Sequence, residues 1–165
     1  GGVFEHNRHP YLVANKAETR DKFGEEQVHQ WRRGYAVRPP AMGATDPRLP
    51  HSDRRYAHVD PADLPYSESL EDTLARTLPY WHDTIVPKIH DGQRVLISAH
   101  GNSLRALVKH LNHISDEDIM GLNIPTGIPL VYEFDEQLNV LNHYYLGAPD
   151  KVREAEQAVA HQLSA

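Results

Sequence analysis

The sequence contains no cysteine, which excludes disulfide bonds and thiolate metal sites and fits a reducing, cytoplasmic environment. No apolar run is long enough to span a membrane, so we expect no membrane contact. A basic excess is also lacking. The net charge of −6 argues against nucleic-acid binding, because nucleic-acid-binding surfaces usually carry a basic stripe. An anionic ligand would therefore have to be bound by local positive charge.

Histidine is frequent, with 12 residues, but their spacing has no metal-ligand pattern such as two histidines one helical turn apart beside a glutamate. We interpret most of them as surface residues and expect no metal cofactor. With 39% hydrophobic and 24% charged residues, the chain has an ordinary globular composition. Its 165 residues predict a single domain with a substantial core.

The most informative stretch is residues 94–108. Residues 95–97 are apolar and rich in β-branched side chains, which predicts a strand buried on both faces of a largely parallel sheet. A helix should follow, with Asn102 or Ser103 as its N-cap. Its apolar positions recur at helical spacing, at Leu104, Leu107, Val108 and Leu111.

His100 lies between this predicted strand and helix, and Gly101 would permit a tight turn. The first N–H groups of a helix lack intrahelical partners and favour an anion. His100, Gly101 and Asn102 therefore predict a phosphate or carboxylate site. A structural histidine in an ordinary strand-to-helix connection is the alternative that the spacing leaves open.

Two short helices are expected near the beginning of the chain. Asn15 would cap the first, Gly24 would end it, and the second would run over residues 25–33. The second helix ends in Arg32 and Arg33. Such a pair is usually a solvated helix terminus, although two adjacent guanidinium groups can also bind an oxyanion.

The remaining chain predicts alternating loops, helices and one hairpin. A proline-rich loop should cover residues 34–65, followed by a long amphipathic helix from Ser67 or Ser69 to the Asp91-Gly92 stop. Pro79 and Pro87 should kink or break that helix. Further elements are expected as a short helix at residues 115–122, an antiparallel hairpin of residues 130–134 and 140–146 that makes the sheet mixed, and a weak helix or mobile tail over residues 151–165.

Four separated segments together resemble the cofactor-dependent phosphoglycerate mutases of the histidine phosphatase superfamily, over about residues 15–147. The resemblance implies an α/β fold, a three-layer α/β/α sandwich with a mixed, mostly parallel sheet. It also implies interconversion of 3-phosphoglycerate and 2-phosphoglycerate, in glycolysis and gluconeogenesis, through a phosphohistidine primed by 2,3-bisphosphoglycerate. The segments are Asn15-Lys16-Ala17-Glu18-Thr19, Trp31-Arg32-Arg33-Gly34, Ala99-His100-Gly101-Asn102-Ser103-Leu104-Arg105-Ala106-Leu107 and Leu122-Asn123-Ile124-Pro125-Thr126-Gly127-Ile128-Pro129-Leu130-Val131-Tyr132-Glu133.

Site roles follow from the resemblance residue by residue. Lys16, Arg32 and Arg33 would bind the phosphate and carboxylate oxygens of the substrate, which reverses the solvated interpretation of the arginine pair. The Gly101 N–H and Asn102 would hold the phosphate at the start of the helix. His100 would be the second active-site histidine, hydrogen-bonded to the phosphoryl group during transfer. Counting back without gaps places Glu5 on the family's general acid and base.

The family's nucleophilic histidine belongs to an Arg-His-Gly motif on its first strand, and no Arg-His-Gly occurs in this sequence. The resemblance thus implies that the family's first strand and helix are lacking and that residues 1–14 are an atypical start. We expect a partial domain over residues 1–165 that binds small phosphoglycerates and is inactive alone. Complete members are expected to be dimers or tetramers. A non-catalytic phospho-ligand binder is the competing interpretation, and a simple phosphatase would need the same missing histidine.

Overall fold

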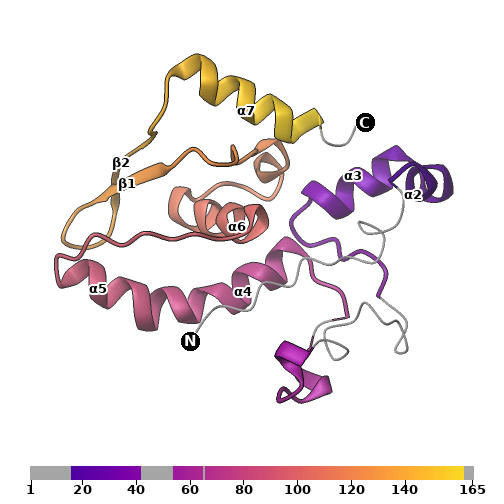
Figure 1. The fold of residues 1–165 in the computed structure, drawn as a ribbon, viewed down its shortest axis with the longest axis horizontal. Helices are drawn as coiled ribbons and strands as arrows, with labels where there is room; N and C mark the ends of the chain where they lie inside the picture. The colour runs from indigo at the N-terminus through magenta and orange to yellow at the C-terminus, as the bar shows by residue number, and fades with distance from the viewer. Residues whose placement is uncertain (1–15, 42–53, 65, 162–165) are drawn as a thin grey trace.

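The structure is a computed structural model that describes residues 16–41, 54–64 and 66–161. The fold is mixed α/β. Within the described residues, helices surround a small core and a single sheet consists of two antiparallel strands (Figure 1). The parallel strands of the expected mixed sheet are absent from this part of the chain.

Two short helices open the described chain, α2 (Lys16–Phe23) and α3 (Glu25–Arg33), as predicted. Gly24, with φ 83°, separates them in a left-handed conformation that favours glycine. The rings of Phe23 and Trp31 meet edge to face at 5.0 Å and hold the helices together. The end of α3 is therefore fixed relative to α2.

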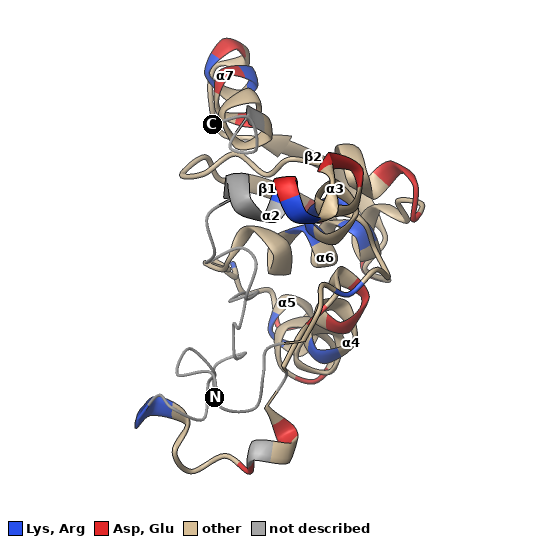
Figure 2. Cartoon of the chain, turned by 90° about the vertical axis from the view of Figure 1, so that its right-hand side faces the viewer, with Lys and Arg blue, Asp and Glu red and all other residues tan. Residues whose placement is uncertain are grey.

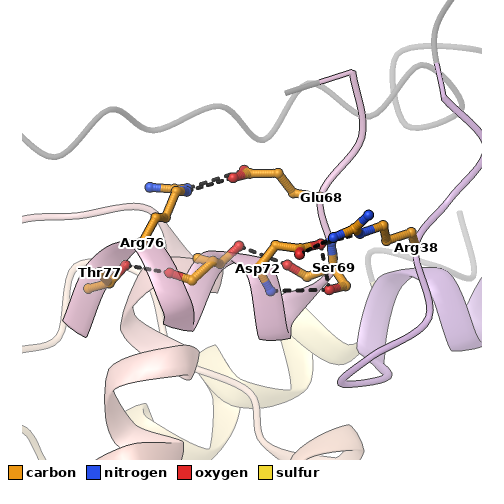
Figure 3. Close-up of polar contacts among 7 residues, drawn as sticks. Arg38, Glu68, Ser69, Asp72, Arg76 and Thr77 are labelled. Carbon is orange, nitrogen blue, oxygen red and sulfur yellow. Dashed lines mark hydrogen bonds and ion pairs between the residues drawn. The ribbon is translucent and has the colours of Figure 1, made fainter. Parts of the chain in front are cut away.

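The predicted long helix begins where its sequence indicates. Ser69 caps α4 (Leu70–Tyr80): its hydroxyl accepts a hydrogen bond from the Asp72 N–H, while the Asp72 carboxylate accepts one from the Ser69 N–H (Figure 3). Arg38 donates two hydrogen bonds to the same carboxylate, and Arg76 pairs with the buried Glu68 at 2.7 Å. These contacts attach the 34–41 segment to the start of α4.

The two prolines break this helix in a specific way. A π-helical turn (Trp81–Ile85) separates α4 from α5 (Val86–His90). Pro79 and Pro87 have no N–H to donate to the preceding turn, so the helix cannot keep its regular hydrogen-bond pattern there. The widened turn buries Trp81 against Phe134, with ring centroids 6.2 Å apart.

The core lies between α4, α6 (Gly101–Asn112) and a 3₁₀ turn, η5 (Asp118–Gly121). Leu70, Ala106 and Ile119 are its buried apolar residues, and Ala106 and Ile119 are completely inaccessible to solvent. The short helix predicted over residues 115–122 is this 3₁₀ turn, and the Ser115 hydroxyl caps its start by accepting from the Asp118 N–H. Packing of α4 on α6 thus positions the segment that contains His100.

The predicted hairpin is confirmed. Strand β1 (Leu130–Phe134) pairs with β2 (Val140–Tyr145), and Tyr132 lies opposite His143. The Tyr132 hydroxyl donates a hydrogen bond to the Asn112 Oδ1 at 3.1 Å, which attaches the hairpin to the end of α6. Burial raises the pKa of Tyr132 to about 12. This hydroxyl therefore stays protonated as a donor.

The strand expected at residues 95–97 is a wrong prediction for this structure. Residues 93–100 form neither helix nor strand, and the side chain of Leu96 is 88% exposed. A central strand needs hydrogen-bonded neighbours on both sides. In the described residues β1 and β2 pair only with each other, so the segment has no sheet to join.

The expected loop at residues 34–65 contains two 3₁₀ turns in its described part, η2 (Arg54–Tyr56) and η3 (Pro61–Asp63). At the other end of the chain, the structure adopts the helical alternative, α7 (Pro149–His161), which runs back toward α3 in Figure 1. No helix in the described ranges combines the length and apolar character needed to cross a bilayer.

The contact between Arg38 and Asp72 makes a prediction for pH dependence. The hydrogen bond from Arg38 lowers the pKa of Asp72 to about 2, below the ordinary value of about 4. The carboxylate thus stabilises the fold above pH ~4, and this contribution is lost as the pH falls toward ~2. In urea unfolding, Asp72→Asn should lower the free energy of unfolding at pH 7 by about 1 kcal/mol or less, as for other partly exposed ion pairs.

The difference in free energy of unfolding between the wild type and Asp72→Asn should shrink as the pH falls from ~4 to ~2. Asp91→Asn, at an exposed carboxylate beyond α5, serves as the matched control and should behave like the wild type. An Asp72→Asn deficit that stays constant down to pH ~2 would contradict the role assigned to the ion pair.

Candidate functional site

The predicted site residue His100 is itself the N-cap of α6, in place of the expected Asn102 or Ser103. Its Nδ1 accepts a hydrogen bond from the Asn102 N–H at 3.2 Å. This bond needs a lone pair on Nδ1, so the ring proton of the neutral imidazole is on Nε2. The exposed His100 ring can therefore donate a hydrogen bond from Nε2 at the start of a helix.

Gly101 is the first residue of α6, and its φ is not in the left-handed region. The backbone at Gly101 therefore does not require a glycine. A Cβ atom placed there would meet no described atom within 4 Å. The glycine leaves open space in front of the helix N-terminus, next to the His100 cap.

The arginine pair lies at the C-terminal end of α3. Arg33 is buried, and its Nη2 donates to the Val159 carbonyl of α7 at 3.1 Å. Arg32 is half-buried, and its guanidinium forms no hydrogen bond or ion pair with any described residue. Burial lowers the pKa of both groups, and the charge of Arg33 lowers that of Arg32 further.

A third arginine joins the two parts of the site. The buried Arg105 of α6 donates to the Asn102 Oδ1 at 3.3 Å and to the carbonyls of Arg32 and Arg33 at 3.5 and 3.0 Å. It also donates to the carbonyls of Ile119 and Leu122 at 2.7 and 3.0 Å. The structure thus brings the arginine pair next to the first turn of α6.

Positive charge is concentrated here without compensation. Basic residues occur in both α3 and α6 near the middle of Figure 2, and Arg105 contacts the backbone of Arg32 and Arg33, although the net charge of the chain is −6. Within the described ranges, Arg32, Arg33 and Arg105 form no ion pair with a carboxylate. Burial and the charge of Arg33 lower the pKa of Arg105 to about 10. This electrostatic environment favours an anion.

Two buried polar atoms beside this cluster have no hydrogen-bond partner among the described residues, the Ser103 hydroxyl and the Asn123 Oδ1. They directly follow Asn102 and Leu122, which both accept hydrogen bonds from Arg105. Unpaired buried polar atoms are uncommon and destabilising. The Ser103 hydroxyl and the Asn123 Oδ1 can therefore each form a further hydrogen bond beside the residues that Arg105 contacts.

Two predicted residues are placed incompletely or not at all. Lys16 is the first residue of α2, and α2 packs against α3. The structure does not describe the Lys16 side chain. Glu5 lies outside the described residues. Among the described residues, no group of three or more His, Asp or Glu side chains could hold a metal ion.

Sequence reasoning missed Arg105, Ser103 and Asn123. Arg105 and Lys109 lie one turn apart and outside the apolar stripe of α6, where charged side chains usually face solvent. Both are buried in the structure. No sequence signal identified their burial: Arg105 adjoins Ala106 and Lys109 lies three residues after it, and only the structure shows that Ala106 is completely buried.

The two neighbouring arginines should differ in their effect on stability. Arg33→Gln should lower the free energy of unfolding by about 1 kcal/mol, because the hydrogen bond to α7 is lost. Arg32→Gln should leave the stability unchanged or raise it, since burial and the charge of Arg33 oppose a positive charge there.

Urea unfolding at low and high salt measures this difference, with the exposed Arg94→Gln as control. Any gain from Arg32→Gln should shrink in high salt as the repulsion is screened. Equal losses for Arg32→Gln and Arg33→Gln would be inconsistent with an uncompensated charge at Arg32.

Residues 40–146 match the histidine phosphatase superfamily (branch 1), which is more than half of the 165 residues. The matched region contains His100, Gly101, Asn102 and Arg105, together with the core and the hairpin, whereas the arginine pair precedes it. Membership points to phosphoryl transfer of the phosphatase or mutase type. The histidine that caps α6, the start of this helix and the concentrated positive charge agree with that chemistry. The chain belongs to the histidine phosphatase superfamily.

Proposed function

We propose that this chain carries the phospho-ligand site of a phosphoglycerate mutase, an isomerase that interconverts 3-phosphoglycerate and 2-phosphoglycerate. The observation that carries the proposal is the set of three arginines without a carboxylate partner in the described residues, next to the His100-capped start of α6. Phosphoglycerates carry a phosphate and a carboxylate and need several positive donors. The four sequence segments typical of the mutases support this choice over a simple phosphatase.

Each residue would contribute in a distinct way. Arg32, whose donors are unused within the described chain, would bind phosphate or carboxylate oxygens in a bidentate manner. Arg33 would exchange its contact with the Val159 carbonyl for the ligand, and Lys16 would add a further charge. His100 would donate from Nε2 to an oxygen of the phosphoryl group as charge develops there.

The Gly101 N–H and the Asn102 side-chain amide would complete the anion site at the helix start. The Asn102 N–H is bonded to His100, so the side chain rather than the main chain of this residue would reach the ligand. The primer 2,3-bisphosphoglycerate would supply the phosphoryl group, and the same arginines would bind it. Glu5, which the structure does not describe, is retained as the proposed acid and base.

The fold proposed for the complete site is a three-layer α/β/α sandwich. The exposure of Leu96 supports it, because an 88% exposed leucine in an apolar run is typical of a surface that packs against another layer.

A non-catalytic phospho-ligand binder is the second candidate. It is favoured by one observation: the sequence contains no Arg-His-Gly, and His100 is preceded by Ala99. Such a protein would use the same arginines and His100 to bind a phosphorylated ligand but could not form the phosphohistidine.

Ligand binding tests what both candidates share. Isothermal titration of the wild-type chain with 3-phosphoglycerate should show saturable binding that weakens with salt. Arg32→Gln should weaken it roughly 10- to 100-fold, because a hydrogen bond to a charged group contributes about 1.5–3 kcal/mol. Arg94→Gln should bind normally. Equal binding of glycerate, which lacks the phosphate, would refute a phospho-ligand site.

Phosphorylation tests the role assigned to His100. We expect that the chain incubated with radiolabelled 2,3-bisphosphoglycerate forms no acid-labile phosphoenzyme, because it has no Arg-His-Gly nucleophile. Acid-treated and neutral samples are compared by gel autoradiography, with His100→Asn as control. Acid-labile label that is lost in His100→Asn would identify His100 as the nucleophile and overturn the role assigned to it.

A further inference from the structure

We propose that Arg105 is a positioning residue: it holds the end of α3, with the arginine pair, against the first turn of α6, without binding the ligand itself. This inference rests on the proposed phospho-ligand site. It predicts that anion affinity depends on a buried side chain of the helix rather than only on the residues that contact the anion.

The hydrogen bonds of Arg105 identify this role. A guanidinium has five N–H donors, and the structure supplies five oxygen acceptors for them. The Nε bonds the Leu122 carbonyl, Nη1 bonds Arg32 and Asn102, and Nη2 bonds Arg33 and Ile119. With 3% exposure and every donor used, Arg105 has no capacity left for a ligand.

The acceptors come from places that need a donor. Arg32 and Arg33 end α3, and the last carbonyls of a helix have no intrahelical partner. Leu122 directly follows η5, and its carbonyl accepts from Arg105; the Ile119 carbonyl, within η5, accepts from both the Leu122 N–H and Arg105. A cation also suits the negative end of the α3 dipole. One planar side chain thus satisfies two buried helix ends and fixes their separation.

The consequence for the site is geometric. Nη1 contacts both the Arg32 carbonyl and the Asn102 Oδ1, so the backbone from which the Arg32 side chain extends is fixed relative to the helix start. The Asn102 N–H in turn bonds the His100 ring. A displacement of about 1 Å at such a site can reduce function by roughly 100-fold.

Lys109 provides a matched comparison. It lies one turn after Arg105 on α6, is also buried, and bonds the Ile114 carbonyl at 2.6 Å and Asp116 at 2.8 Å. It forms no hydrogen bond with α3 or Asn102 among the described residues. Its ammonium also lies over the ring of Tyr35 at 4.4 Å. Because Lys109 bonds neither the end of α3 nor Asn102, its loss should destabilise the fold without displacing the arginine pair from the helix start.

The experiment compares Arg105→Gln, Arg105→Lys and Lys109→Gln in the full chain. All three should lower the melting temperature. Titration with 3-phosphoglycerate, at a temperature where each variant is folded, should show affinity reduced about 10- to 100-fold in Arg105→Gln. The reduction should be smaller in Arg105→Lys, which keeps the charge but has only three donors. Lys109→Gln should bind within about twofold of the wild type.

Amide hydrogen exchange gives a readout that needs no ligand. Arg105→Gln and Arg105→Lys should accelerate exchange at the Gly34 N–H, which caps α3, and at the Asn102 N–H, whereas Lys109→Gln should not. Unchanged exchange at both amides, or equal affinity losses in Arg105→Gln and Lys109→Gln, would overturn the positioning role. Failure of the wild type to bind 3-phosphoglycerate, with exchange as expected, would instead refute the proposed function.

Discussion

The interaction on which the site depends is the burial of one guanidinium among backbone oxygens. Arg105 could not be buried without acceptors, and the ends of α3 and η5 could not be buried without donors. Their contact satisfies both requirements at once. It also brings together segments from the first and the middle part of the chain, which the apolar core of Leu70, Ala106 and Ile119 alone does not connect to α3.

The three arginines differ in how completely their donors are used. Arg105 is saturated by five oxygens, Arg33 has one contact with α7, and Arg32 has none among the described residues. Of the three, Arg32 therefore keeps the most unused donors and Arg105 keeps none. The arginines also agree with the superfamily match, because a concentrated positive charge beside the histidine that caps α6 suits phosphoryl transfer.

The segment before His100 shows the limit of local sequence patterns. Apolar, β-branched residues predict a buried strand, yet residues 93–100 are not in a sheet and Leu96 is exposed. Strand formation depends on partners distant in the sequence, and β1 and β2 pair only with each other. The hairpin was predictable because both of its strands and their turn are contiguous. The same holds for the Ser69 cap and the break near Pro79, which depend on residues within one or two turns.

The sequence by itself determined most of the helices, the Ser69 cap, the hairpin and the superfamily, because these depend on local spacing, turn chemistry and motif order. It also indicated His100, Gly101, Asn102, Arg32 and Arg33 as site residues, and the structure brings the arginine pair next to the helix start. Only the tertiary structure decided that the polar side of α6 is buried and that Arg105 connects the two groups. A charged residue opposite an apolar stripe normally faces water. Here the carbonyls at and near the ends of two distant helices supply acceptors for the buried guanidinium, and no local pattern records where those carbonyls will lie.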